Sequence, residues 1–186
     1  DCAGVVVTGY RAPSFSIDGR TPWAFAELSE QGFAYSSSVA PVVHDHYGWP
    51  EAPRFAFRPL PWTSLVELPV TTAMLGGRRV AAGGGGFFRV LPYAFSRWAI
   101  RQVNRQEARP AVFYFHPWEI DPDQPRVPHA PMRSRLRHYT GLAQMADKLR
   151  GLVREFRWGR MDMVAHREAA RAGELALPDP APEFAA

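Results

Sequence analysis

The sequence predicts an α/β fold with mostly parallel strands, arranged either as an open sheet or as a barrel. Two observations favour this fold class. Apolar runs typical of buried strands alternate with segments of helical periodicity, and an early strand–helix–strand unit has the length of a parallel crossover, about 30 residues. With 186 residues, 46% of them hydrophobic, the chain is long enough to bury a sizeable core.

The strand–helix–strand unit lies at the start of the chain. Residues 5–10 form a β-branched run that predicts a buried strand, and Arg11-Ala12-Pro13-Ser14 follows as a loop at its carboxyl end. Thr21, as an N-cap before Pro22, predicts a helix that ends at Gly32. Residues 33–39 predict the second strand.

The middle of the chain alternates between loop, strand and helix patterns. Residues 40–62 are rich in proline and aromatic side chains, which predicts a long structured loop. Residues 64–75 predict a strand that Pro69 places at an edge or a bulge. Residues 91–107 have helical spacing, and residues 111–115 give the clearest strand pattern of the sequence, ending at His116-Pro117-Trp118.

The last third predicts one long helix and a final strand. Residues 136–156 are amphipathic, and one face of this helix carries Leu142, Met145, Leu149, Leu152 and Phe156. Residues 157–164 predict a strand, and the segment after them, residues 169–186, predicts a flexible tail. We therefore expect one domain over residues 1–168.

The composition bears on the partners, the cysteine chemistry and the location of the protein. The formal net charge of +4 comes from arginine, because Lys148 is the only lysine, but no arginine run with interleaved aromatics predicts a nucleic-acid partner. Cys2 is the only cysteine, so neither an intramolecular disulfide nor a thiolate cluster is possible. This is compatible with a cytoplasmic location, which we favour over the periplasm. No apolar run is long enough to predict a transmembrane segment.

Two strand ends carry candidate chemistry. In α/β folds ligands bind at the carboxyl ends of the strands, so Arg11, Ser14 and His116 are expected on the same rim. His116 can act as a general acid or base, or it can be an ordinary core histidine. Arg11 can orient a carboxylate or form a surface ion pair, and the backbone N–H of Ser14 can donate to an oxyanion.

Two further motifs are weaker. His44-Asp45-His46 has spacing that can chelate a metal, but the sequence offers no third ligand. The four glycines 83–86 lack the pattern of a phosphate loop and instead predict a close approach of backbone to another strand or to a polymer.

Several of these segments together resemble the polysaccharide deacetylase family, the NodB-homology or carbohydrate esterase family 4 group. They are GYRAPSFSI, GFAYSSSV, HDHYGWPEAPRF, GGGGFFRVLPY, FYFHPWEIDPDQPR and RHYTGL. The resemblance covers residues 4–165 and is nearest to the bacterial branch associated with exopolysaccharide gene clusters. It implies a distorted (β/α) barrel with a C-terminal extension, and hydrolysis of acetyl groups on an acetylated polysaccharide or oligosaccharide with a divalent metal, usually zinc.

The resemblance also implies roles for individual residues. Arg11 matches the arginine that orients the catalytic aspartate, Ser14 the backbone oxyanion donor, and His116 the general acid. The remaining expected groove residues, which contact the sugar, are Pro13, Tyr35, Gly85, Phe87 and Trp118.

Two departures from the family pattern matter. The Asp-Asp pair and the H-x-x-x-H motif that supply the base and the metal ligands precede the Arg-x-Pro turn, and this chain contains neither. We therefore expect that the N-terminal metal-binding half of the domain is missing. We also expect that this chain alone binds no metal and has no deacetylase activity. The family also has an aspartate that tunes its histidine where this chain has Ser36, and Glu119 or Asp121 could compensate. A non-catalytic carbohydrate-binding or assembly module is the alternative.

Overall fold

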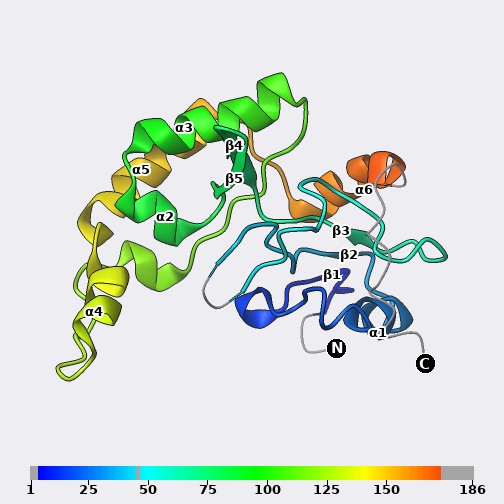
Figure 1. The fold of residues 1–186 in the computed structure, drawn as a ribbon, viewed down its shortest axis with the longest axis horizontal. Helices are drawn as coiled ribbons and strands as arrows, with labels where there is room; N and C mark the ends of the chain where they lie inside the picture. The colour runs from blue at the N-terminus through cyan, green and yellow to red at the C-terminus, as the bar shows by residue number, and fades with distance from the viewer. Residues whose placement is uncertain (1–3, 45–46, 173–186) are drawn as a thin grey trace. The chain divides into compact units, whose positions relative to one another are not determined.

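A computed structural model describes residues 4–44 and 47–172. These residues form two compact units, which are coloured along the chain in Figure 1. Unit 1 comprises residues 4–70 and 159–172, and unit 2 comprises Thr71–Trp158. The result is a mixed α/β chain with a parallel sheet in unit 1 and a helical unit 2.

Unit 1 is built on three short parallel strands in the order β1, β2, β3. They span Gly9–Tyr10, Tyr35–Ser36 and Val66–Glu67. Helix α1, Ala24–Glu30, connects β1 to β2, which confirms the predicted parallel crossover, although the helix begins after Trp23 and not at Thr21. The sheet packs beside helix α6, Met161–Ala172, which contacts β3.

The prediction of a buried strand over residues 5–10 is wrong for residues 5–8. Val5, Val6 and Val7 are 70%, 87% and 61% exposed, and the strand contains only its last two residues. The physical reason is that β1 is an edge strand, since no strand of the described chain pairs with its other side. A β-branched run without a neighbouring strand has nothing to pack against.

The core of unit 1 combines α1 with the long loop of residues 40–62. Phe25 and Leu28 from α1 pack with Phe57 and Trp49 from the loop. The loop is therefore structured, as predicted. Phe57 of this loop also pairs with Glu67 in an isolated antiparallel bridge on the side of β3 away from β2.

Unit 2 begins with an antiparallel hairpin. Strands β4, Thr72–Leu75, and β5, Arg78–Ala81, are joined by Gly76 and Gly77, whose positive φ values of 56° and 76° suit glycine. The hairpin is followed by α2, Gly85–Val90, and α3, Tyr93–Arg101, which continues into a π-helical turn, Gln102–Gln106. The predicted helix over residues 91–107 is thus confirmed.

Three further predicted elements are wrong. Residues 111–115 are extended but form only a single parallel bridge, between Gly84 and Tyr114, because no strand lies alongside their whole length. Residues 64–75 divide into β3 and β4, which belong to different units. The strand expected over residues 157–164 is instead the start of α6, where Asp162 favours the first helical turn.

The long helix predicted over residues 136–156 is two helices. Helix α4, Met132–Tyr139, and helix α5, Leu142–Glu155, are separated by Gly141, which has a φ of 76°. The predicted apolar face of α5 is confirmed, since Leu142, Met145 and Leu152 are buried and Leu149 and Phe156 pack against the cluster around Phe88. Helix α6 extends to Ala172, into the segment expected to be a tail, and residues 173–186 lie outside the described chain.

Within the described ranges, no helix is both long enough and apolar enough to cross a lipid bilayer.

Candidate functional site

His116 stands at the start of a short 3₁₀ helix, Pro117–Ile120, in unit 2. Pro117 follows His116 and restricts its backbone to the extended conformation that the structure shows. The His116 side chain is 58% exposed. The imidazole is in stacking contact with Trp118 at 5.9 Å and meets Tyr114 edge-on at 5.8 Å between ring centroids. His116 is therefore an accessible histidine and not a core residue.

Glu119 and His116 are joined by two hydrogen bonds. The backbone N–H of His116 donates to Oε2 of Glu119 at 2.8 Å, and the N–H of Glu119 donates to the carbonyl of His116 at 2.9 Å. The same Oε2 is 3.5 Å from Nδ1 of the imidazole. Of the two acids that the sequence offered as neighbours of His116, Glu119 contacts it, whereas Asp121 caps the backbone of Asp123.

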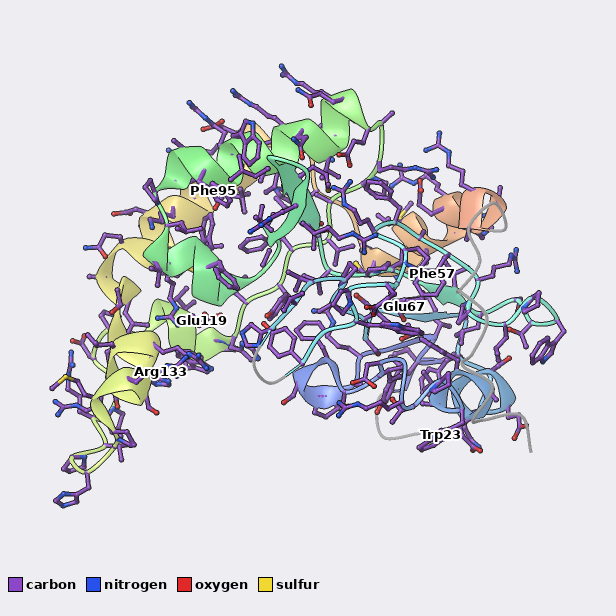
Figure 2. All side chains as sticks on the ribbon, viewed as in Figure 1. Trp23, Phe57, Glu67, Phe95, Glu119 and Arg133 are labelled. Carbon is purple, nitrogen blue, oxygen red and sulfur yellow. The ribbon has the colours of Figure 1, made fainter. Side chains whose placement is uncertain are left out.

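Arg89 of α2 pairs with the other oxygen of Glu119. Its Nε donates to Oε1 at 2.9 Å, and both side chains are 2% exposed. Nη1 donates to the carbonyls of His138 and Thr140, and Nη2 donates to the carbonyl of Arg137, all at the end of α4. A buried charge pair is costly to break, so this cluster fixes Glu119 firmly. Figure 2 labels Glu119 at this position.

Gly85 makes room for the Glu119 carboxylate. A Cβ built at Gly85 would overlap both oxygens of Glu119, so no other residue fits without displacing the acid. The sequence predicts that the glycines 83–86 allow a close approach of backbone to another strand or to a polymer. The structure assigns that approach at Gly85 to Glu119, and at Gly83 to the backbone of Thr71 and Val112.

A set of planar side chains extends from His116. Trp118 stacks on His138 at 4.2 Å with an interplanar angle of 11°, and the guanidinium of Arg89 lies 5.0 Å from the centre of a Trp118 ring. Nε2 of His138 lies 2.7 Å from Oε1 of Gln124, and the amide Nε2 of Gln124 donates to the carbonyl of Trp118. Phe87, on α2, is exposed. The Trp118 ring therefore packs against His138 and the Arg89 guanidinium within unit 2.

Arg11 is held by the serine run that follows β2 in unit 1. Its Nε donates to the carbonyl of Ser37 at 2.8 Å and its Nη2 to the Ser37 hydroxyl at 2.6 Å. Ser37 in turn donates to the carbonyl of Leu68. The guanidinium also lies 5.7 Å from the ring centre of Phe15. Arg11 is therefore a positioned, half-buried side chain and not a loose surface charge.

Ser14 has an uncommon backbone conformation. Its φ is 55° and that of Phe15 is 51°, both in the left-handed region, directly after the exposed Pro13. Strained backbone of this kind is concentrated at functional sites. Arg11, Pro13 and Ser14 belong to unit 1 and His116 to unit 2, so their common rim stays a prediction.

Tyr35 lies on β2, opposite Gly9 of β1 in the parallel register. A Cβ at Gly9 would overlap the Tyr35 ring, so the glycine allows the ring to lie across β1. Burial, followed by the charge of Asp162, raises the pKa of the Tyr35 hydroxyl.

Glu67 is a fully buried acid that the sequence analysis missed. It is paired in register with Ser36, and its Oε1 accepts the N–H groups of Ser38 and Val39 at 2.8 and 2.9 Å. Its Oε2 is buried and makes no hydrogen bond within the described residues. Desolvation raises the pKa of Glu67, and the Ser36 side chain and the N–H groups of Val39 and Ser38 offset part of the effect. An acidic residue inside the apolar run of residues 64–70 was the available signal.

The described residues do not provide a metal centre. No group of three or more His, Cys, Asp or Glu side chains within residues 4–44 and 47–172 has the geometry to hold an ion. His44 stacks on Tyr47 at 3.9 Å, and its predicted partners Asp45 and His46 lie outside the described residues. The zinc implied by the family resemblance therefore has no matching ligand set in the described chain.

Comparison with known proteins gives one match. The family described as "Domain of unknown function (DUF3473)" matches residues 37–166. Neither the curated proteins nor the solved structures include a match. The matched range contains the serine run, Glu67, Arg89 and the His116–Glu119 helix. Because it covers more than half of the sequence, the chain belongs to the DUF3473 family.

Proposed function

We propose that this chain carries part of the active site of a metal-dependent deacetylase acting on an acetylated amino-sugar polysaccharide. The observation that carries the proposal is an accessible histidine, His116, set on a rigid proline-locked turn beside a buried carboxylate. The DUF3473 domain is associated with polysaccharide deacetylase-like proteins, which supports the same reading. In this proposal the three parallel strands of unit 1 belong to a distorted (β/α) barrel.

The reaction adds water across the acetyl carbon–nitrogen bond and releases acetate and a free amine. His116, as an imidazolium, donates a proton to the leaving nitrogen as that bond breaks. The strained turn at Ser14 presents a backbone N–H to the developing oxyanion, and Arg11 orients a carboxylate. Residues outside this chain would hold the divalent metal, which is zinc by resemblance, and would supply the catalytic base.

Acetate release from N-acetylated chito-oligosaccharides tests the proposal. The complete polypeptide in which this chain occurs should release acetate in the presence of zinc, and this chain alone should release none. In that polypeptide His116→Ala should lower turnover at least a hundredfold, within the range for general acid catalysis of about 10²–10⁴. His129→Ala, which changes an exposed histidine of the same unit, should not. Equal turnover of the two variants would remove His116 from the reaction.

A non-catalytic carbohydrate-binding module is the second candidate. It is favoured by the stacked rings of Trp118 and His138 beside the exposed imidazole of His116. In that case the complete polypeptide would bind the oligosaccharide without releasing acetate at any zinc concentration.

A further inference from the structure

We propose that helix α4 and the loop before it form a docking surface for an anionic lipid bilayer. This α4 surface combines exposed aliphatic side chains with exposed arginines. Its aliphatic members are Val127, Met132 and Leu136, and its arginines are Arg126, Arg133, Arg135 and Arg137. Binding to lipid is separate from the proposed reaction and does not depend on it.

The contacts of α4 establish which side of the helix faces unit 2. His138 stacks on Trp118 at 4.2 Å, so the side that carries His138 faces the unit. Successive residues of an α-helix are about 100° apart, and Leu136, two positions before His138, therefore lies on nearly the opposite side. Met132, one turn earlier, shares that side with Leu136. The exposure agrees, since Met132 and Leu136 are 78% and 62% exposed and none of the eight described residues of α4 is buried.

The loop before α4 adds a third aliphatic side chain to the outer side of the helix. The backbone N–H of Val127 donates to the hydroxyl of Tyr139 at 3.0 Å. Tyr139 is seven positions after Met132, which is close to two full turns, so it belongs to the same side as Met132 and Leu136. This hydrogen bond therefore holds Val127, which is 59% exposed, beside the apolar side of α4.

Arginines surround these aliphatic side chains. The guanidinium of Arg126 lies 4.7 Å from the ring centre of Tyr139, at the edge of the apolar side. The other three are exposed on α4 itself, where Figure 2 labels Arg133. Residues 124–146 contain these four arginines and no acidic residue. Each basic residue close to an anionic leaflet strengthens membrane binding roughly fivefold, so this local excess of positive charge matches an acidic bilayer.

The aliphatic side chains identify the partner as lipid and not as a soluble polyanion. A hydrated polyanion can pair with arginine, but it has no apolar interior that could bury Met132 and Leu136. A basic helix with apolar side chains on one side lies at the boundary between the headgroups and the acyl chains of a bilayer. The guanidinium suits the headgroup region, because it can bind a phosphate with two parallel hydrogen bonds.

Co-sedimentation with lipid vesicles tests the proposal. The 186-residue chain is mixed with vesicles of phosphatidylcholine alone, or with vesicles of phosphatidylcholine and phosphatidylglycerol in equal amounts. The partition coefficient should be at least about tenfold higher for the anionic vesicles, and it should fall as the salt concentration rises. Equal partition into the two kinds of vesicle, or no binding to either, would overturn the proposal.

A pair of apolar variants tests whether α4 is the surface that binds. Met132→Gln/Leu136→Gln should lower the partition coefficient for anionic vesicles about tenfold, because two aliphatic side chains no longer enter the bilayer. The matched control is Val153→Gln/Met163→Gln, which changes two exposed aliphatic side chains on α5 and α6 and should leave the coefficient unchanged. Circular dichroism of both variants checks that the helices are retained.

A pair of arginine variants tests the charge. Arg126→Gln/Arg135→Gln should lower the partition coefficient at least about tenfold, whereas Arg154→Gln/Arg157→Gln, at exposed positions away from α4, should lower it less than about twofold. If the first of these variants lost binding while Met132→Gln/Leu136→Gln bound like the wild type, the α4 surface would bind a polyanion and the lipid proposal would be wrong. Acetate release is measured separately, so either proposal can fail while the other stands.

Discussion

Arg89 and Glu119 form an ion pair at 2.9 Å in the interior of unit 2, and the pair joins α2 to the turn that carries His116. The two residues are 30 positions apart in the sequence. Arg89 also binds the last carbonyls of α4, so three separate segments of the unit meet at one guanidinium.

Removing Arg89 should strongly destabilise unit 2. Arg89→Met leaves the Glu119 carboxylate buried without its partner, which costs about 3–5 kcal/mol. The double variant Arg89→Met/Glu119→Met should recover part of that loss, because no isolated charge then remains in the interior. Urea unfolding of both variants measures the difference. Arg97→Met, which breaks an exposed pair with Glu155, should cost less than about 1 kcal/mol. A similar loss of unfolding free energy in Arg97→Met and Arg89→Met would contradict the claim that burial makes the Arg89–Glu119 pair more costly to break.

Glu67 should make unit 1 less stable as the pH rises. Burial raises the pKa of Glu67 in the folded state, so the folded chain holds this proton more tightly than the unfolded chain. Above the unfolded value, about pH 4.3, folding must therefore retain a proton that the unfolded chain releases, and stability falls with increasing pH. Glu67→Gln removes this titration. The variant should match the wild type near pH 4 and become progressively more stable than it toward neutral and alkaline pH, about pH 7–9.

Denaturant unfolding at several pH values checks this difference. Glu30→Gln, at an exposed position at the end of α1, is the matched control and should follow the wild-type curve. If the gap between Glu67→Gln and the wild type did not widen with pH, Glu67 would not be the group that titrates.

Gly83 should not tolerate a side chain. A Cβ at this position would overlap the carbonyl of Val112 and press on the backbone N of Thr71, which donates to the same carbonyl. Because both neighbours are backbone, Gly83→Ala should cost more than about 1–3 kcal/mol, the usual loss from overpacking. Gly86→Ala has open space and should be neutral or should stabilise α2 by up to about 1 kcal/mol. Thermal unfolding of the pair measures the contrast, and equal midpoints would refute it.

Trp118 should contribute to carbohydrate binding. Its ring forms part of the planar set with His138 and His116, so truncation removes a stacking face. Trp118→Ala should weaken binding of an N-acetylated chito-oligosaccharide about tenfold in calorimetry, equivalent to roughly 1.4 kcal/mol. Trp62→Ala, which removes an exposed tryptophan of unit 1, should leave the affinity unchanged. Undiminished binding by a folded Trp118→Ala variant would exclude this surface.

The elements that could be predicted from the sequence are those with a local physical cause. The crossover through α1, the helix over residues 91–107 and the apolar face of α5 all follow from periodicity, and each is present in the structure. Residues 111–115 have the same strand-like composition as a sheet strand but gain only one bridge, because a strand depends on neighbours that its own sequence does not specify.

The same distinction applies to the site. The accessible turn at His116 could be predicted, since proline and histidine after an apolar run define it locally. Its supporting residues could not. Arg89 looks like one of many arginines, and only tertiary packing reveals that it meets Glu119 and the end of α4. Ser36 stands where the family resemblance expects an acid, and the acid paired with it in register, Glu67, comes from the next strand of the sheet.

Lys148 on α5 gives the chain a built-in chemical probe. Its ammonium group donates to the carbonyls of Phe88, Arg89 and Leu91 at the end of α2, and desolvation lowers its pKa. Because it is the only lysine, every side-chain amine that an acylating reagent modifies is this one. While α5 stays packed on α2, the amine is occupied by three carbonyls and protected. The contact between α5 and α2 holds α2 in place, and with it Arg89. The rate at which Lys148 is acylated therefore measures how often this contact opens.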